Sequence, residues 1–137
     1  DKDAKPYETI QNKTPNAADD LHTTIQDYGN FLVSILDGAN LKENIYQEML
    51  QKQVQTKESK YFGLGFEIYD LGQEEFALSH GGSDLGTQCI AFLLPKTKQG
   101  ILIFTNSDVG HIIFEKLLTL YLGDNGKKII EIEMKQK

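Results

Sequence analysis

The sequence has 137 residues, a net charge of −6 and a single cysteine, and 39% of its residues are hydrophobic. This length and composition fit one globular domain with a modest core. The acidic balance excludes a nucleic-acid partner, because phosphate binding needs a concentrated basic face. The lone Cys89 excludes an internal disulfide, and no apolar run reaches the about 18 residues of a membrane-spanning helix.

The first half of the chain predicts a connection followed by two helices. Residues 1–20 are polar and show neither the helical nor the strand period, which is typical of a surface connection. A helix is predicted over 24–37, because Thr24 and Asp27 form a capping box and apolar residues follow at helical spacing. A second helix, 41–52, follows after a short turn.

The pattern changes to strands beyond Lys60. Four runs are rich in aliphatic and aromatic residues and are separated by turn residues: 61–69, 75–79, 88–94 and 101–105. A parallel crossover needs a dozen or more residues, and these connections are shorter. The sequence therefore predicts an antiparallel meander of about four strands.

The chain ends in a broad apolar stripe and an alternating tail. Residues 109–122 carry the stripe and are predicted to be a helix pressed onto the sheet. Residues 127–135 alternate apolar and charged side chains, which indicates either an extra strand or a frayed end. The predicted fold class is α+β, in one domain (1–137) that comprises a connection (1–20), two helices (24–52), antiparallel strands (61–105), a helix (109–122) and a possible extra strand (127–135).

A histidine followed by two glycines, His80-Gly81-Gly82, stands between two strand-like runs and is predicted to form a tight turn. Such a segment lets backbone approach a ligand closely and leaves its amide groups unobstructed. The same residues are common in solvated turns without any function. Gly82-Ser83 also opens a near match to the nucleophile elbow of alpha/beta-hydrolases, but Leu85 stands where that motif has glycine, and an antiparallel meander is wrong for that fold.

Four segments, in order, carry a resemblance to a known family. Residues 16–36, 61–66, 80–82 and 103–107 are similar to the carboxy-terminal part of the serine beta-lactamase-like family, which includes class C beta-lactamases, penicillin-binding proteins and related esterases. The resemblance covers about residues 15–122. It implies an incomplete part of the beta-lactamase/transpeptidase-like fold.

The resemblance also assigns roles to the histidine segment. His80 and Gly82 match the family's histidine-x-glycine motif, in which the first residue offers a positive or hydrogen-bonding group to the substrate and the glycine lets an extended substrate lie against a strand. Gly81 occupies the position that varies. The N–H of Ser83 would be one oxyanion donor, and the second would come from a serine absent from this sequence.

The family's other two motifs are not found. None of the five serines is followed three residues later by lysine. Tyr28-Gly29-Asn30 spells the tyrosine-x-asparagine motif, but it falls inside the predicted helix, where residues two apart point in nearly opposite directions. Tyr28 is therefore predicted to be core and Asn30 surface. The expectation is a carboxy-terminal fragment, inactive alone, with no catalytic residue, cofactor or metal of its own.

Two further expectations follow from the fragment interpretation. With helices on one face only, the sheet would leave its other face and one edge bare, so the chain should bind its missing amino-terminal part, dimerise or swap strands. The parent would act on a small-molecule or peptide substrate (a beta-lactam, peptide or ester) outside the cytoplasm of a bacterium, at the periplasm or cell envelope, although these residues contain no signal segment. The alternative is a non-catalytic module that recognises a peptide, a glycan or a partner protein.

Overall fold

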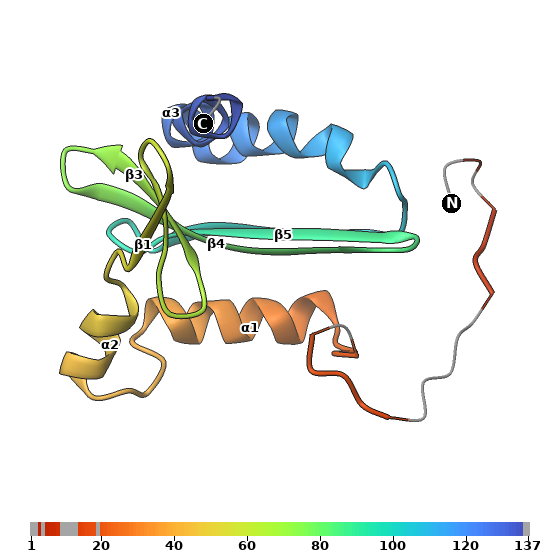
Figure 1. Cartoon of the computed structure of the whole chain (residues 1–137), viewed down its shortest axis with the longest axis horizontal. Helices are drawn as coiled ribbons and strands as arrows, with labels where there is room; N and C mark the ends of the chain where they lie inside the picture. The colour runs from red at the N-terminus through yellow and green to blue at the C-terminus, as the bar shows by residue number, and fades with distance from the viewer. Residues whose placement is uncertain (1–2, 4, 9–13, 19, 136–137) are drawn as a thin grey trace.

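The structure is a computed structural model, and it describes residues 3, 5–8, 14–18 and 20–135. One six-stranded antiparallel sheet lies between helices that pack on both of its faces, as Figure 1 shows. The strands follow one another in the sheet in chain order, from β1 to β6. The fold is therefore α+β, as the sequence predicts, with a meander as its centre. Among the described residues, no helix is long and apolar enough to cross a membrane.

Helix α1 spans Ile25–Leu36 and begins at the predicted cap. The Asp27 N–H donates to Thr24 Oγ1 at 3.1 Å, and the Thr24 hydroxyl in turn donates to the Asp27 carboxylate at 2.8 Å. This satisfies one of the backbone donors that a helix leaves unpaired at its start. Helix α2 is short, Glu43–Met49, and has no buried residue.

The six strands join through short connections, and each pairs antiparallel with the next. Their bounds are β1 Val54–Lys57, β2 Lys60–Phe62, β3 Glu67–Gly72, β4 Glu75–Asp84, β5 Thr87–Leu94 and β6 Gln99–Thr105. The predicted run 61–69 is in fact two strands, because the connection 63–66 interrupts it. Strand β1 precedes the predicted start of the sheet, and its four residues, VQTK, carry no apolar alternation that would reveal it.

The segment His80-Gly81-Gly82 is not the turn that its residues alone indicate; it lies on a strand, where the family resemblance also places it. Strand β4 continues through it to Asp84, and each of its residues has a partner on β5: His80 faces Ala91, Gly81 faces Ile90 and Gly82 faces Cys89. The turn comes later, at Leu85 and Gly86, where Gly86 has a φ of +75° that favours glycine.

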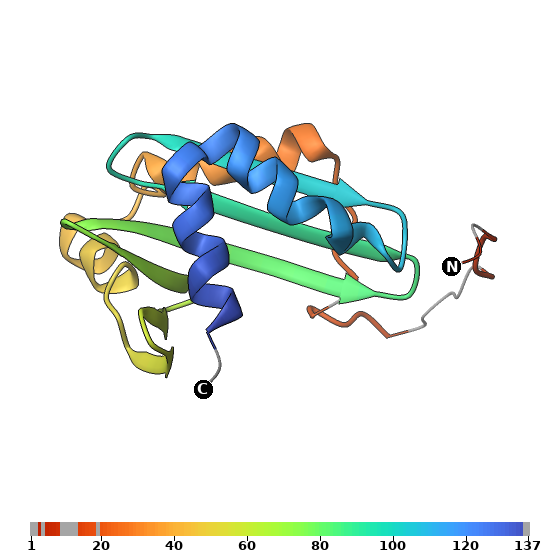
Figure 2. The ribbon, with the colours of Figure 1, turned by 90° about the horizontal axis from the view of Figure 1, so that it is seen from above.

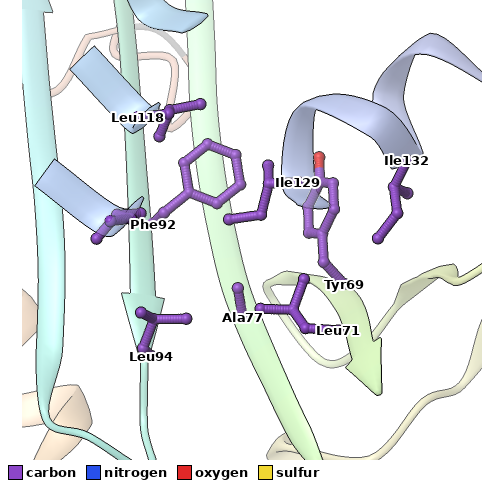
Figure 3. Packing of buried hydrophobic residues seen from close by; sticks show 9 residues of the cluster. Tyr69, Leu71, Ala77, Phe92, Leu94, Leu118, Ile129 and Ile132 are labelled. Atoms are coloured by element: carbon purple, nitrogen blue, oxygen red, sulfur yellow. The ribbon is translucent and has the colours of Figure 1, made fainter. Parts of the chain in front are cut away.

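Both faces of the sheet are covered, which corrects the expectation of one bare face. Alternate residues of a strand point to opposite faces, so Leu78 packs with α1 and Ala77 packs with α3. Figure 3 shows the cluster on the α3 side, where Tyr69, Phe92 and Ile129 meet. Unpaired strand edges in the described part of the chain include those of β1, β6, the end of β3 and the far half of β4.

The tail 127–135 is helical, which corrects the possible extra strand. A 3₁₀ turn, η1 (Gly110–Ile113), leads into α3 (Phe114–Met134), which bends at Gly123 and crosses the sheet with its second half (Figure 2). Ile129 and Ile132 are three residues apart, so both fall on one side of a helix and enter the core. At the bend, a Cβ on Gly126 would lie 2.1 Å from the Leu118 carbonyl oxygen, so only glycine allows this close packing.

Candidate functional site

The far half of β4 is an open strand edge. Strand β3 pairs with β4 only up to Ser79, so residues 80–84 have β5 on one side and no strand on the other within the described residues. All five of these residues are exposed, and Figure 2 shows β4 running well past β3. An edge strand turns the N–H and C=O of every second residue outward, which makes it a template for an added extended chain.

His80 is the first residue of this open segment, and it points to the α1 side of the sheet, as the buried Leu78 does two residues earlier. Its ring packs edge-on against Phe66, with centroids 6.2 Å apart and an interplanar angle of 75°. This contact fixes one side of the imidazole and leaves the residue exposed. His80 can therefore offer a hydrogen bond to a molecule lying along the edge.

The two glycines leave the strand bare. A Cβ on Gly82 would meet only the Cys89 sulfur, at an ordinary 3.5 Å, so the fold itself does not require glycine there. A Cβ on Gly81 would lie 3.0 Å from the Cys89 carbonyl oxygen, which is tight. Neither residue has a positive φ. The space beside Gly82 is therefore open to a molecule that binds along this strand.

Ser83 and Asp84 complete the segment just before the turn. Ser83 is paired with Gln88 of β5, and Asp84 with Thr87. The Asp84 carboxylate accepts the N–H of Leu85 at 2.7 Å, which helps to close the turn. The structure thus brings all four predicted site residues, His80 to Ser83, onto one continuous stretch of strand.

Asp108, which sequence reasoning missed, ties down the β4–β5 turn. One of its carboxylate oxygens accepts the Gly86 N–H at 2.7 Å, and the other accepts the Tyr7 hydroxyl at 2.7 Å. The hydrogen bond to Asp108, together with burial and the carboxylate charge, raises the pKa of Tyr7. The ring of Tyr7 also packs on Gly86, where a Cβ would approach it to 2.8 Å. Tyr7 and Asp108 are 101 residues apart, so no local pattern could have revealed the contact.

Gln88 connects the same region to the start of the carboxy-terminal helix. Its side-chain N–H donates to the Asp108 carbonyl at 2.8 Å, and its side-chain oxygen accepts the His111 N–H at 2.7 Å. Its own carbonyl accepts the Thr105 hydroxyl at 2.9 Å. Gln88 is therefore held from three directions, directly across the ladder from Ser83.

Tyr28 and Asn30 do not form a second motif. The Tyr28 ring packs on Phe31 and Phe104, at centroid distances of 5.5 and 5.7 Å, and burial raises its pKa. Asn30 is exposed on another side of α1. In the described part of the chain, no group of three or more His, Cys, Asp or Glu side chains could hold a metal ion.

Two shallow depressions lie at the other end of the sheet. They have volumes of about 500 and 360 Å³ and share Leu50, Glu74 and Phe76 in their walls. His80 lines neither of them. Glu74 belongs to the β3–β4 turn, so the paired half of β4 lies between the depressions and the open segment.

The sheet, the helices on its two faces and the open end of β4 together make up an α+β domain. The sequence matches the family described as Beta-lactamase over residues 1–120, and the chain belongs to that family. Among solved structures it is similar to a penicillin binding protein from Bacillus halodurans, with 18% identity and a TM-score of 0.59. This likeness covers 70% of this chain and 30% of that protein, so the chain spans less than a third of its length. No curated protein matches.

Proposed function

We propose that this chain forms one wall of the active-site cleft of a serine hydrolase, and that the attacking serine lies in polypeptide upstream of Asp1. The observation that carries the proposal is the open stretch of β4, where His80, Gly82 and Ser83 stand in the order of the family's third motif on an unpaired edge. The absence of any serine-x-x-lysine from the sequence supports the second half of the proposal.

The open segment is suited to hold an extended acyl substrate. The substrate would add to β4 as a further strand, with the bare Gly82 allowing it to lie close and His80 donating a hydrogen bond to it. The Ser83 N–H would then donate to the carbonyl oxygen of the scissile bond, together with the N–H of the upstream serine. Such a pair of donors stabilises the negative charge that develops on that oxygen in the transition state.

The chemistry of the parent is nucleophilic acyl transfer. The upstream lysine, with the tyrosine of the second motif as relay, takes the proton of the serine hydroxyl as the oxygen attacks the carbonyl carbon. The tetrahedral adduct collapses, the leaving group departs with a proton, and an acyl-serine ester remains. Water then attacks this ester, which releases the acid and returns the proton to the serine. This chain supplies binding and charge stabilisation, and it is inactive alone.

The open segment itself contains no lysine or arginine, and Asp84 is its one carboxylate. A segment with this charge suits an ester or another neutral acyl compound among the substrates the family accepts. A substrate with its own carboxylate would therefore meet no lysine or arginine on this segment, and His80 would serve it as a hydrogen-bond donor. Peptides and beta-lactams remain candidates where the upstream polypeptide adds a cation.

The partner of this chain is the upstream part of the same protein. The outer edge of β6 is unpaired in the described residues, and its sequence, QGILIFT, has no charge or proline to protect it. A strand from the upstream polypeptide would cover this edge. In isolation the chain would instead dimerise or swap strands, and size-exclusion chromatography with light scattering would detect either. We place the parent outside the cytoplasm, at the bacterial cell envelope.

A labelling experiment tests the proposal. The full-length protein should react with a fluorophosphonate or penicillin probe at one serine, and the isolated chain should not. In the full-length protein, Gly82→Val should reduce labelling strongly because its side chain occupies the path of the substrate, whereas the control Gly29→Ala, on α1 with open space around it, should not. Labelling of the isolated chain, or full labelling of the Gly82→Val protein, would refute the assignment.

A second candidate is a non-catalytic module that binds an extended peptide. The same open edge of β4 favours it, because main-chain pairing alone can hold a peptide strand. The two candidates differ in the upstream sequence. A parent without serine-x-x-lysine that still binds a peptide, with loss of binding in Gly82→Val, would identify the module.

A further inference from the structure

The turn that follows the open segment is fixed by more bonds than a surface hairpin needs. The Asp108 carboxylate accepts the Gly86 N–H and the Tyr7 hydroxyl, both at 2.7 Å, and the Asp108 carbonyl accepts a side-chain N–H of Gln88 at 2.8 Å. A two-residue turn between antiparallel strands forms without such support. These additional hydrogen bonds therefore indicate that a residue next to the turn must be held in a fixed position.

Ser83 is the residue that this arrangement fixes. It lies on the open side of the hairpin, so β5 is its only neighbouring strand among the described residues, and its partner there is Gln88. Gln88 is anchored to Thr105 through its carbonyl and to His111 and Asp108 through its side chain. An edge strand bonded on one side is otherwise free to twist and fray. Holding Gln88 and Gly86 holds Ser83 both from across the ladder and from the turn that follows it.

We propose that Asp108 is a positioning residue that keeps the Ser83 N–H at the place where the oxyanion forms. The inference rests on the proposed function for the role of Ser83, and on the contacts alone for the fixation of the turn. An oxyanion donor acts only when it is already in place, because the bond must exist as the charge develops. Asp108 does this without touching the substrate.

Tyr7 adds a second contact that helps to fix the β4–β5 turn. Its hydroxyl donates to the Asp108 carboxylate, and its ring packs on Gly86. Tyr7 is thus fastened to the turn that follows Ser83.

The first test uses the 137-residue chain and measures motion of the backbone amides by ¹⁵N relaxation. In the wild type, the order parameter of the Ser83 and Gly86 amides should be that of rigid backbone, about 0.85. Asp108→Ala removes both carboxylate bonds and should lower it to about 0.6 or less at these residues. Asp108→Asn keeps an oxygen for the Gly86 N–H and should retain most of the order, and the control Asp124→Ala, on α3, should leave it unchanged.

The second test uses the full-length protein and an ester substrate such as p-nitrophenyl acetate. Asp108→Ala should lower kcat about tenfold, less than the loss of the whole donor, and leave KM within about twofold, because the donor acts in the transition state. Asp108→Asn should restore most of kcat, and Tyr7→Phe should give a smaller loss. A purely structural role would instead lower the amount of folded protein and leave kcat per folded molecule unchanged.

The two tests distinguish failure of the positioning role from failure of the proposed function. Unchanged order at Ser83 in a folded Asp108→Ala chain would overturn the positioning role, and so would a rise in KM with normal kcat. A wild-type full-length protein that neither reacts with the probe nor cleaves the ester would instead overturn the proposed function. In that case the order parameters would still decide whether Asp108 fixes the turn.

Discussion

Replacing Glu133 by glutamine should make the stability of this chain less sensitive to acid. Glu133 lies near the end of α3 and joins that helix to three strands: its carboxylate accepts bonds from Lys57 at 2.9 Å, Lys60 at 2.5 Å and the Tyr69 hydroxyl. Burial alone would raise the pKa of Glu133, but these three donors outweigh it and lower the pKa to about 2 from an ordinary 4.5. Glu67, at 2.9 Å, is the other carboxylate that faces Lys60.

The magnitude follows from that difference in pKa. Each unit corresponds to about 1.4 kcal/mol, so the full shift would contribute about 3.4 kcal/mol. The Glu133 side chain is 39% exposed, and solvent screening reduces the contribution to about 1–2 kcal/mol. Because the folded pKa lies below the unfolded one, this stability is present above pH 4.5 and is lost as the pH falls towards 2.

The assay is urea unfolding followed by far-ultraviolet circular dichroism, since the chain has no tryptophan. At about pH 6, Glu133→Gln should lower the free energy of unfolding by about 1–2 kcal/mol, and at about pH 3 the difference from wild type should be less than half as large. Glu131→Gln, an exposed glutamate on the same helical turn, serves as the control and should change little. A difference for Glu133→Gln that stays constant over this range would refute the reasoning.

Two other substitutions test the fold, and both can be measured by the same unfolding assay. Gly126→Ala should lower the free energy of unfolding by about 2 kcal/mol or more, because the new methyl group would lie 2.1 Å from the Leu118 carbonyl oxygen. The control Gly29→Ala, with open space in α1, should be neutral or stabilising. Equal effects of the two substitutions would contradict the packing argument. Thr24→Ala should cost about 1 kcal/mol through loss of the α1 cap, and an unchanged stability would show that Asp27 or solvent replaces the cap.

Local chemistry made part of the fold predictable. The capping box of Thr24 and Asp27 predicted the start of α1, and the short connections between apolar runs predicted an antiparallel meander. The tail was ambiguous because Ile130, Ile132 and Met134 alternate while Ile129 and Ile132 also fit a helix. Contact with the sheet decided it, since Ile129 and Ile132 reach the core only from a helix.

The candidate site was predictable in its residues and not in its surroundings. His80, Gly82 and Ser83 were found from the order of motifs, but glycines suggested a turn where the pairing with β5 in fact continues the strand. The role of Asp108 depends on Tyr7, which is 101 residues away in the sequence, and on Gln88, whose polar side chain in an apolar run had no local explanation. Such contacts arise only when distant segments meet.

The bend at Gly123 has a practical meaning for anyone who prepares this protein. The family match stops at residue 120, three positions before the bend, yet the second half of α3 buries Ile129 and Ile132 against Tyr69 and Leu71. A polypeptide that ends at the limit of the match would expose the hydrophobic surface around Tyr69 and Leu71 to water, and we expect it to precipitate. Expression boundaries for relatives of this chain are therefore better drawn from where the last helix finishes than from where recognisable homology stops.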